Sequence, residues 1–260
     1  MVKGLVGVVH LGALPGDPAY RRGGFGGVYD AARRDMDALA AGGLDAVIVE
    51  NFGSAPFNKG TSEDPAPSHQ VAAICVVAQE ARERFAHVGV NVLRNDAMAA
   101  LGVAAALGLD FVRVNVHVGA YVTDQGVIEG EAARTMRYRS ALGVDVELWA
   151  DVLVKHASPL APLSVEQAAA DTYARGGASA LIVSGTGTGA PVDVGVLERV
   201  RGAAPGAPLY VGSGASPDTA AALGRWCDGA IVGTYLKEGG DVRAPVDAER
   251  VRRMLGAWRG

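Results

Sequence analysis

Short runs of β-branched and other apolar residues alternate along this chain with longer, alanine-rich segments of helical period. The runs are almost continuously apolar, which is typical of strands that are covered on both faces, as in a parallel sheet. Eight strands are predicted in this way: Leu5–Val9, Ala46–Val49, Val88–Val92, Phe111–Val116, Val146–Ala150, Ala180–Val183, Leu209–Val211 and Gly229–Val232.

The segments between these strands predict helices. Glycines such as Gly42–Gly43, Gly108 and Gly176–Gly177 come just after three of them, where a C-cap would turn the chain into the next strand. Strands that alternate strictly with helices predict a parallel sheet. The predicted helices are Val28–Ala41, His69–Phe85, Asp96–Leu107, Glu131–Ala141, Ser164–Arg175, Val192–Ala203, Pro217–Leu223 and Ala248–Trp258.

The length of the chain decides between the two common parallel folds. The chain has 260 residues, and a single (β/α)8 barrel typically needs about 250. An open doubly wound sheet would have fewer strands and would usually carry its glycine-rich turn after the first strand. No linker or shift in composition divides the sequence, so we expect one α/β domain over residues 1–260, a single (β/α)8 TIM barrel.

Composition and charge exclude several classes of protein. Hydrophobic residues make up 49% of the chain and charged residues 20%, which predicts a folded domain with a large core. The net charge of -4, without a basic run, offers no electrostatic footprint for nucleic acid. The most apolar stretch, Met98–Leu109, is shorter than the roughly 20 residues that span a bilayer. Cys75 and Cys227 lie in apolar stretches and are expected to be reduced core thiols, so we expect a cytoplasmic protein without a membrane span.

The predicted C-terminal strand ends, where barrels of this class place their active sites, are unusually polar. Because side chains alternate along a strand, Arg113, Asn115 and His117 are expected on one face of the fourth strand. By the same rule Asp151 and Lys155 share one face of the fifth, and Lys155 would keep Asp151 ionised. The polar positions are His10, Glu50, Asn51, Asn91, Arg94, Asn95, Arg113, Asn115, His117, Asp151, Lys155 and His156.

Two interpretations of these polar positions are open. An unpaired buried polar group costs about 1–3 kcal/mol, so polar residues inside a barrel need a reason. One reason is a structural ion-pair network, with Arg113 or Lys155 against Asp151 or Glu50. The clustering at one end of five successive strands favours the other reason, a functional site.

Three glycine-rich loops follow the sixth, seventh and eighth strands. Glycine lets backbone amides approach an anion, and barrels of this class often hold phosphate with the loops after strands seven and eight. The alternative is that the glycines only make tight turns. The spacing matches neither the dinucleotide fingerprint nor a Walker loop. The predicted phosphate-binding residues are Ser184, Gly185, Thr186, Gly187, Gly212, Ser213, Gly214, Gly233 and Thr234.

Eight strings from these segments are distinctive when taken together: Val8–Gly16, Glu50–Gly53, Val90–Asp96, Arg113–Asn115, Thr123–Gly126, Ala150–Val152, Val154–His156 and Val183–Gly187. They resemble the BtpA family of barrel proteins, and the resemblance extends from the first strand to the eighth. It implies the barrel fold. The family takes its name from a role in photosystem I biogenesis in cyanobacteria, and other members resemble proteins of sugar metabolism. A second histidine is common in the family where this chain has Leu153, which implies one candidate ligand or acid fewer and a changed substrate or reaction.

These features together predict an enzyme that acts on a phosphorylated sugar or a nucleotide-like phosphosugar. The glycine loops would hold the phosphate, while Asp151 and Glu50 would stabilise an oxocarbenium-like centre at the anomeric carbon during glycosyl transfer or cleavage. His10, His117 and Lys155 are the candidate proton donors and acceptors. The predicted substrate-binding residues are Asn51, Asn91, Arg94, Asn95, Arg113, Asn115 and His156.

Other functions stay open at this point. One is a phosphosugar isomerase, epimerase or aldolase, and another is a non-enzymatic assembly or stability factor of the photosystem I biogenesis type. Glu50 is also a candidate ligand for Mg²⁺ together with a phosphate oxygen, although the sequence requires no cofactor. The partner that we expect is a small phosphorylated substrate, and the sequence leaves homo-oligomer formation undecided.

Overall fold

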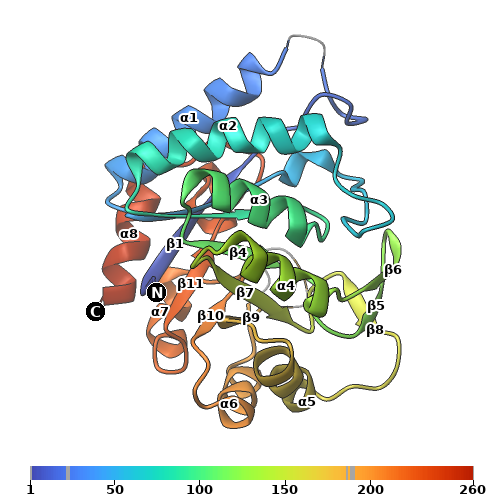
Figure 1. Ribbon diagram of the computed structural model, residues 1–260. Helices are drawn as coiled ribbons and strands as arrows, with labels where there is room; N and C mark the ends of the chain where they lie inside the picture. Colours follow the sequence, from blue (N-terminus) through green and yellow to red (C-terminus); the bar gives the residue numbers. More distant parts are fainter. Residues whose placement is uncertain (1, 22–23, 186, 188–190, 260) are drawn as a thin grey trace.

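Eight parallel strands close into a barrel in the computed structural model, which describes residues 2–21, 24–185, 187 and 191–259. The hydrogen-bonded order is β1-β11-β10-β9-β7-β4-β3-β2, so the first strand pairs with the last (Figure 1). The predicted TIM barrel is therefore confirmed. Its strands are β1 (Gly4–His10), β2 (Ala46–Glu50), β3 (His87–Asn91), β4 (Phe111–Val114), β7 (Glu147–Val152), β9 (Ala180–Val183), β10 (Leu209–Val211) and β11 (Gly229–Val232).

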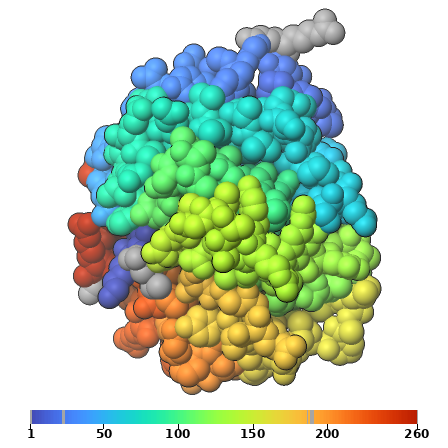
Figure 2. Space-filling view, viewed as in Figure 1, coloured from blue at the N-terminus to red at the C-terminus, as the bar shows by residue number. Residues whose placement is uncertain are grey.

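Within the described residues, eight α-helices surround the strands (Figure 1). Figure 2 shows the side chains of α1 to α4, in blue to green, packed over one side of the barrel. In the part of the chain that is described, no helix has the length and apolar character needed to cross a bilayer. The helices are α1 (Gly26–Ala41), α2 (Ser68–Arg84), α3 (Ala97–Leu107), α4 (Ala132–Leu142), α5 (Val165–Ala170), α6 (Val194–Ala203), α7 (Pro217–Leu223) and α8 (Ala248–Arg259).

The barrel interior holds a stack of three aromatic rings packed among aliphatic side chains. Phe111 stacks on Trp149 with ring centroids 3.9 Å apart, and Trp149 stacks on Tyr210 at 4.0 Å. Gly89 on β3 leaves the space for this stack, because a Cβ there would lie 2.3 Å from Cε2 of Phe111. The rings close the interior below the strand ends, so the C-terminal mouth is left as the place for a site.

β4 and β7 each differ from the sequence prediction by two residues at their C-terminal ends, whereas β1, β2 and β3 differ there by one residue. β4 stops at Val114 instead of Val116, because the side chain of Asn95 binds both backbone groups of Val116 and replaces the next step of the strand pairing. β7 continues to Val152, where Ala150 was expected to be its last residue. The helix predicted for Ser164–Arg175 is instead α5 followed by one π-helical turn, Asp171–Arg175.

A second, three-stranded antiparallel sheet was not predicted. It has the order β6-β5-β8, with β5 at Ala120–Thr123, β6 at Gly126–Glu129 and β8 at Ala157–Pro159. These strands follow β4 and β7 in the chain, so the sheet lies beyond the C-terminal ends of those two strands, at the right of Figure 1. These segments have only three or four residues each, too few to show a clear alternation, so the sequence carries no signal for them.

The contact between Gly89 and Phe111 generates a stability prediction. Gly89→Ala forces a methyl group into the aromatic stack, and overpacking of this kind typically costs about 1–3 kcal/mol. Gly102→Ala is the matched control, because a Cβ in this helical position meets nothing closer than the Tyr138 hydroxyl at 3.8 Å. Alanine should stabilise that helix by about 0.5–1 kcal/mol.

Thermal unfolding followed by circular dichroism measures both variants. We expect Gly89→Ala to lower Tm by at least about 2 °C, given roughly 2–4 °C per kcal/mol for a domain near this size, and Gly102→Ala to raise it or leave it unchanged. An unchanged Tm for Gly89→Ala would show that the interior is loose enough to absorb the methyl group.

Candidate functional site

The uppermost layer of the barrel interior is polar. Inward side chains recur at every second residue of a strand, so the position two residues beyond an interior apolar residue also faces the axis. Ile48, Phe111 and Trp149 belong to the apolar interior, which places Glu50, Arg113 and Asp151 directly above it. Applied to all eight strands, the rule gives the mouth layer: His10, Glu50, Asn91, Arg113, Asp151, Ser184, Gly212 and Gly233.

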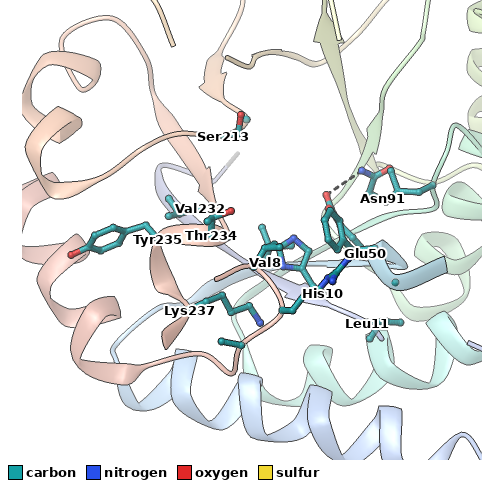
Figure 3. Close-up of a pocket in the computed structure, with 18 of the residues that line it drawn as sticks. Val8, His10, Leu11, Glu50, Asn91, Ser213, Val232, Thr234, Tyr235 and Lys237 are labelled. Atoms are coloured by element: carbon teal, nitrogen blue, oxygen red, sulfur yellow. Dashed lines mark hydrogen bonds between the residues drawn. The ribbon is translucent and has the colours of Figure 1, made fainter. Parts of the chain in front are cut away.

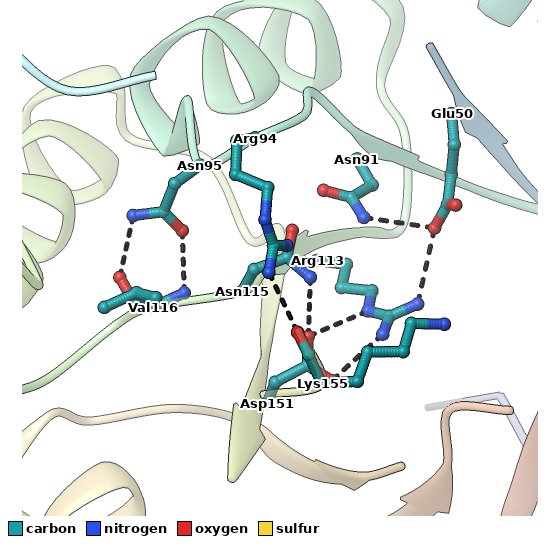
Figure 4. Close-up of polar contacts among 9 residues, drawn as sticks. All are labelled: Glu50, Asn91, Arg94, Asn95, Arg113, Asn115, Val116, Asp151 and Lys155. Carbon is teal, nitrogen blue, oxygen red and sulfur yellow. Dashed lines mark hydrogen bonds and ion pairs between the residues drawn. The ribbon is translucent and has the colours of Figure 1, made fainter. Parts of the chain in front are cut away.

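Arg113 is the centre of a hydrogen-bonded network in this layer (Figure 4). Its Nε and Nη2 donate to the two carboxylate oxygens of Asp151 at 3.1 and 3.0 Å, and its Nη1 donates to Oε1 of Glu50 at 3.4 Å. Asn115 donates to Asp151 at 2.8 Å, and Asn91 donates to the same Oε1 of Glu50 at 3.1 Å. Both oxygens of Asp151 are therefore engaged, whereas Oε2 of Glu50 accepts no hydrogen bond from the described residues.

A cavity of about 1340 Å³ opens above the mouth layer, and Glu50, Asn91 and Arg113 line it. Figure 3 shows Glu50 and Asn91 on one side of this cavity and Ser213 on the other. Asp151 lies beneath the lining, with 1% of its side chain exposed. This corrects the expectation that the two carboxylates face the same pocket: Glu50 does, and Asp151 is covered by its partners.

Lys155 lines the cavity because of a backbone turn that strand alternation does not predict. β7 ends at Val152, and Leu153 then adopts a positive φ of 50°, so Asp151 and Lys155 do not share a strand face. Asp151 pairs with Arg113 and not with Lys155, which corrects the expected Asp151–Lys155 pair.

Lys155 lies among other cations. Its backbone carbonyl accepts a hydrogen bond from Nη2 of Arg94 at 3.0 Å, and both residues line the cavity, as does His156. Burial and the charge of Arg113 lower the pKa of Lys155 to about 8. Burial and the neighbouring Lys155 lower the pKa of His156. Because of these shifts, the amine of Lys155 exchanges its proton closer to neutral pH than an ordinary lysine does.

His117, a candidate proton donor from the sequence, does not reach the cavity. β4 has ended at Val114, so the alternation from Arg113 no longer applies, and Nε2 of His117 binds the carbonyl of Gly176 at 2.8 Å. Burial lowers the pKa of His117. Its hydrogen bond holds the segment after β4 against the segment around Gly176, outside the mouth.

Asn51 and Asn95 are likewise outside the cavity lining. Asn51 donates to the carbonyl of Leu93 at 3.2 Å and accepts from its amide at 2.7 Å, and Asn95 binds the carbonyl and amide of Val116 at 2.9 and 2.7 Å. Each asparagine amide binds the backbone N–H and C=O of a neighbouring segment, as the backbone of an adjacent strand would. Together they position the turn that carries Arg94, which does line the cavity.

His10 lies between the two sides of the cavity (Figure 3). Burial, with the positive charges of Lys237 and Lys155, lowers the pKa of His10 to about 3, so the imidazole is neutral at physiological pH. Its ring contacts that of Phe52, with centroids 4.7 Å apart, and its Nδ1 has no hydrogen-bond partner in the described structure. A neutral imidazole with a free nitrogen can donate to or accept from a ligand in the cavity.

The loops after β10 and β11 form one wall of the cavity. The residues Gly212–Ala215 and Gly233–Thr234 all line it. The backbone amides of Ser213, Gly214 and Ala215 donate no hydrogen bond within the described chain, and the hydroxyl of Ser213 is buried without a partner. Three successive free amides and a hydroxyl make a concave donor set suited to an anion.

The loop after β9 is only partly described. Ser184 borders the site, because a Cβ at Gly212 would lie 2.5 Å from its Oγ and 3.2 Å from Nη2 of Arg113. Gly185 and Gly187 are not among the described lining residues of the cavity, and a Cβ at Gly187 would lie 4.0 Å from the ring of His156. Thr186, which the phosphate prediction also included, lies outside the described residues.

Sequence reasoning missed a buried ion pair in the cavity wall. Nζ of Lys237 lies 2.5 Å from Oδ2 of Asp35, and Oδ1 of Asp35 accepts from the amide of Val246 at 2.8 Å. The sequence signal that could have revealed this pair is Asp35 itself, a carboxylate next to Met36 on the buried face of α1. This pair fixes the loop after β11 against α1, and both side chains line the cavity.

The cavity is rich in positive charge although the protein is acidic overall. Among its described lining residues, seven basic side chains stand against four acidic ones, in a chain whose net charge is -4. Such a concentration of cations favours an anionic ligand. The basic residues are Arg34, Arg94, Arg113, Lys155, Lys237, Arg243 and Arg250, and the acidic ones are Asp35, Glu50, Asp124 and Asp218.

A metal site made only of protein side chains finds no support in this arrangement. Within the described residues, no group of three or more His, Cys, Asp and Glu side chains could hold an ion. A Mg²⁺ ion bound by Glu50 together with the phosphate oxygens of a substrate needs fewer protein ligands, and it stays a prediction.

Comparisons with known proteins give the chain its relatives. A model of the BtpA family matches residues 1–259. The chain is 43% identical over 254 residues to the photosystem I biogenesis protein BtpA of Synechocystis sp., covering 97% of this chain and 87% of that protein. It is 44% identical over 254 residues to an uncharacterised protein of Thermococcus kodakarensis, covering 97% and 94%.

Among solved structures, the chain is similar to N-(5'-phosphoribosyl)anthranilate isomerase from Pyrococcus furiosus, with a TM-score of 0.56, 12% identity and 99% of each chain covered. At that identity the similarity shows the barrel fold alone. The family match extends over almost the whole chain, and the two relatives named above match at 43% and 44% identity. The chain therefore belongs to the BtpA family, as the resemblance in its sequence implied.

Proposed function

We propose that this protein is an enzyme that acts on a phosphorylated sugar, at the carbon that carries the anomeric or carbonyl oxygen. The observation behind the proposal is one cavity that combines a wall of free donors with a carboxylate on its floor. The free amides of Ser213, Gly214 and Ala215 lie on the wall, and Glu50 lies on the floor. A phosphate on the wall would place the sugar over the floor.

The donor wall is the proposed phosphate site. Hydrogen bonds to a charged group are worth about 1.5–3 kcal/mol each, so three amides and the Ser213 hydroxyl offer substantial affinity for a phosphate. The loops after strands seven and eight of such barrels are a recurrent phosphate site. The name of the similar solved structure, a phosphoribosylanthranilate isomerase, is in keeping with a phosphorylated substrate for this fold.

Glu50 is the proposed catalytic carboxylate. Arg113 and Asn91 hold its Oε1, and Oε2 is left open to a substrate. A carboxylate so held can stabilise an oxocarbenium-like centre, as glycosyl transfer or cleavage needs, or accept a proton, as isomerisation needs. Asp151 is proposed as a positioning residue that orients Arg113 and Asn115, whose Oδ1 has no partner and can accept a sugar hydroxyl.

A second candidate function comes from the relative that is named for photosystem I biogenesis. On this alternative the chain is an assembly or stability factor, and the barrel is a scaffold. The buried, unpartnered polar atoms of His10, Asn115 and Ser213 favour the enzyme, because a scaffold gains nothing from leaving them without partners. The cytoplasmic location expected from the sequence is compatible with either function and stays a prediction.

Phosphate binding is tested with D-ribose 5-phosphate and D-ribose. We expect the phosphate ester alone to raise Tm, by an amount that corresponds to about 2.7 kcal/mol at a concentration of 100 Kd. Ser213→Ala should weaken binding of the ester about tenfold to a hundredfold in calorimetry, because it removes one hydrogen bond to the phosphate. Tm of the free protein should stay the same, since the Ser213 hydroxyl has no protein partner.

The matched control for this experiment is Ser158→Ala, an exposed serine on β8. It should leave the Kd unchanged. If a panel of sugar phosphates gives no Tm shift and the protein co-purifies with a membrane complex, the scaffold alternative is favoured and the enzyme proposal fails.

The roles of the two carboxylates are tested by comparing Glu50→Gln with Asp151→Asn, using a sugar phosphate that the wild-type protein converts. Glu50→Gln should reduce kcat about 10²- to 10⁴-fold with little change in Kd. Asp151→Asn should mainly lower Tm, because it removes the closest counter-charge of buried Arg113, a change that typically costs about 3–5 kcal/mol. The reverse pattern, with Tm unchanged and turnover lost in Asp151→Asn, would make Asp151 the catalytic group.

A further inference from the structure

We propose that Lys155 is a catalytic nucleophile that forms a Schiff base with the carbonyl carbon of an open-chain sugar phosphate in this cavity. The inference rests on the proposed function. It favours isomerisation, epimerisation or aldol cleavage over glycosyl transfer, because those reactions can proceed through an imine. It draws on the position of the side chain, the backbone around it and the groups that face it.

The first observation is that Lys155 lies in the cavity without a counter-ion. Its side chain runs alongside the guanidinium of Arg113, and its amino group ends on the side of Glu50 (Figure 4). Within the described residues, Nζ makes no hydrogen bond or ion pair. The other lysine of the cavity, Lys237, contrasts with it, since Asp35 neutralises Lys237 at 2.5 Å.

The second observation is the backbone on both sides of Lys155. Leu153 and His156 have φ values of 50° and 59°, and they are the two non-glycine residues with positive φ in the described chain. Strained backbone of this kind is retained where the surrounding structure enforces it, often at functional sites. Here β7 before the turn, β8 after it and the Arg94 hydrogen bond to the Lys155 carbonyl enforce it. The turn directs Lys155 into the mouth.

The third observation is the charge that faces the amine. Arg113 from β4 and Arg94 from the turn after β3 oppose its protonation, and Glu50 from β2 and Asp151 from β7 favour it. Burial is the largest cause, and together with the two arginines it lowers the pKa of Lys155 to about 8. A substantial fraction of free, nucleophilic amine is therefore present in weakly basic solution, which an ordinary lysine does not provide.

The step balances without an external oxidant or reductant. The Nζ lone pair attacks the carbonyl carbon, the carbonyl electron pair moves to oxygen, and the nitrogen loses a proton as that oxygen gains one. The resulting carbinolamine then loses water as the C–N double bond forms. Oε2 of Glu50, which is open to the cavity, is the group placed to carry the proton from nitrogen to the departing oxygen.

Reductive trapping on the intact protein tests the inference. The protein is incubated with dihydroxyacetone phosphate or D-ribose 5-phosphate and sodium cyanoborohydride, and a trapped imine adds the mass of the sugar phosphate less one oxygen atom. The chain has four lysines, Lys3, Lys59, Lys155 and Lys237, so peptide mass spectrometry locates the adduct without ambiguity. We expect it on Lys155, and at least about tenfold less with dihydroxyacetone or D-ribose, which have no phosphate to be held at the wall.

Two variants and a pH series sharpen the test. Lys155→Arg keeps the positive charge and should abolish the adduct, while the Tm shift with sugar phosphate persists. Lys59→Arg, outside the cavity lining, should trap at the wild-type rate. The trapping rate should rise about tenfold per pH unit below pH 8 and level off above it, since the free amine of Lys155 is the reactant. An ordinary lysine would keep rising to about pH 10.4.

The outcomes separate this inference from the proposed function. If the sugar phosphates raise Tm and no adduct forms on Lys155, the imine is overturned and the phosphosugar proposal stands. If neither a Tm shift nor an adduct appears, both fail. An adduct confined to Lys237, or one that forms equally well without the phosphate group, also overturns the assignment of Lys155.

Discussion

The buried guanidinium of Arg113 is the charge around which the mouth of the barrel is arranged. An ion with 4% of its side chain exposed needs counter-charges, because an uncompensated charge in the interior costs several kcal/mol. Asp151 from β7 and Glu50 from β2 supply them, with Asn115 and Asn91 satisfying part of the carboxylate oxygens. The need to neutralise Arg113 therefore orients both carboxylates, and it buries Asp151 while leaving one oxygen of Glu50 open.

The same network sets the charge of the cavity floor. Arg113 and Lys155 balance Glu50 and Asp151 when all four are ionised, and loss of the Lys155 proton leaves an excess of one negative charge. A protonated imine on Lys155 would restore the balance, because its nitrogen again carries a positive charge. On the proposed reaction, Glu50 and Asp151 are the groups that favour the protonated, electrophilic form of the imine, whereas burial, Arg113 and Arg94 oppose it.

Side-chain positions could be predicted from the sequence where they lie within regular strands. The prediction of side-chain direction failed beyond the ends of the strands. Glu50, Asn91 and Arg113 lie within strands near their C-terminal ends, so their positions in the sequence were enough to place them in the mouth. His117 and Lys155 come after their strands have stopped, where local hydrogen bonds and the positive φ of Leu153 decide the direction of each side chain.

Contacts between distant segments were also beyond the sequence. Asp35 and Lys237 are 202 residues apart, and no local pattern joins them. The roles of Asn51 and Asn95 were misjudged for a related reason, since an asparagine that binds backbone looks the same in a sequence as one that binds substrate. The glycine loops after β10 and β11 were easier to interpret, because their chemistry lies in the backbone and requires no side chain to point in a given direction.

The aromatic stack beneath the mouth has a consequence for how the family can diversify. Phe111, Trp149 and Tyr210 close the interior together with aliphatic side chains such as Val8 and Ile48, so a change in the polar layer above them opens no hole in the core. Positions such as His10 and Asn91 can then be exchanged one at a time in evolution. Arg113, Glu50 and Asp151 must change as a group, because losing one leaves a charge buried. Relatives should therefore differ from one another by single substitutions at the other mouth positions, whereas Arg113, Glu50 and Asp151 should be kept together or replaced together.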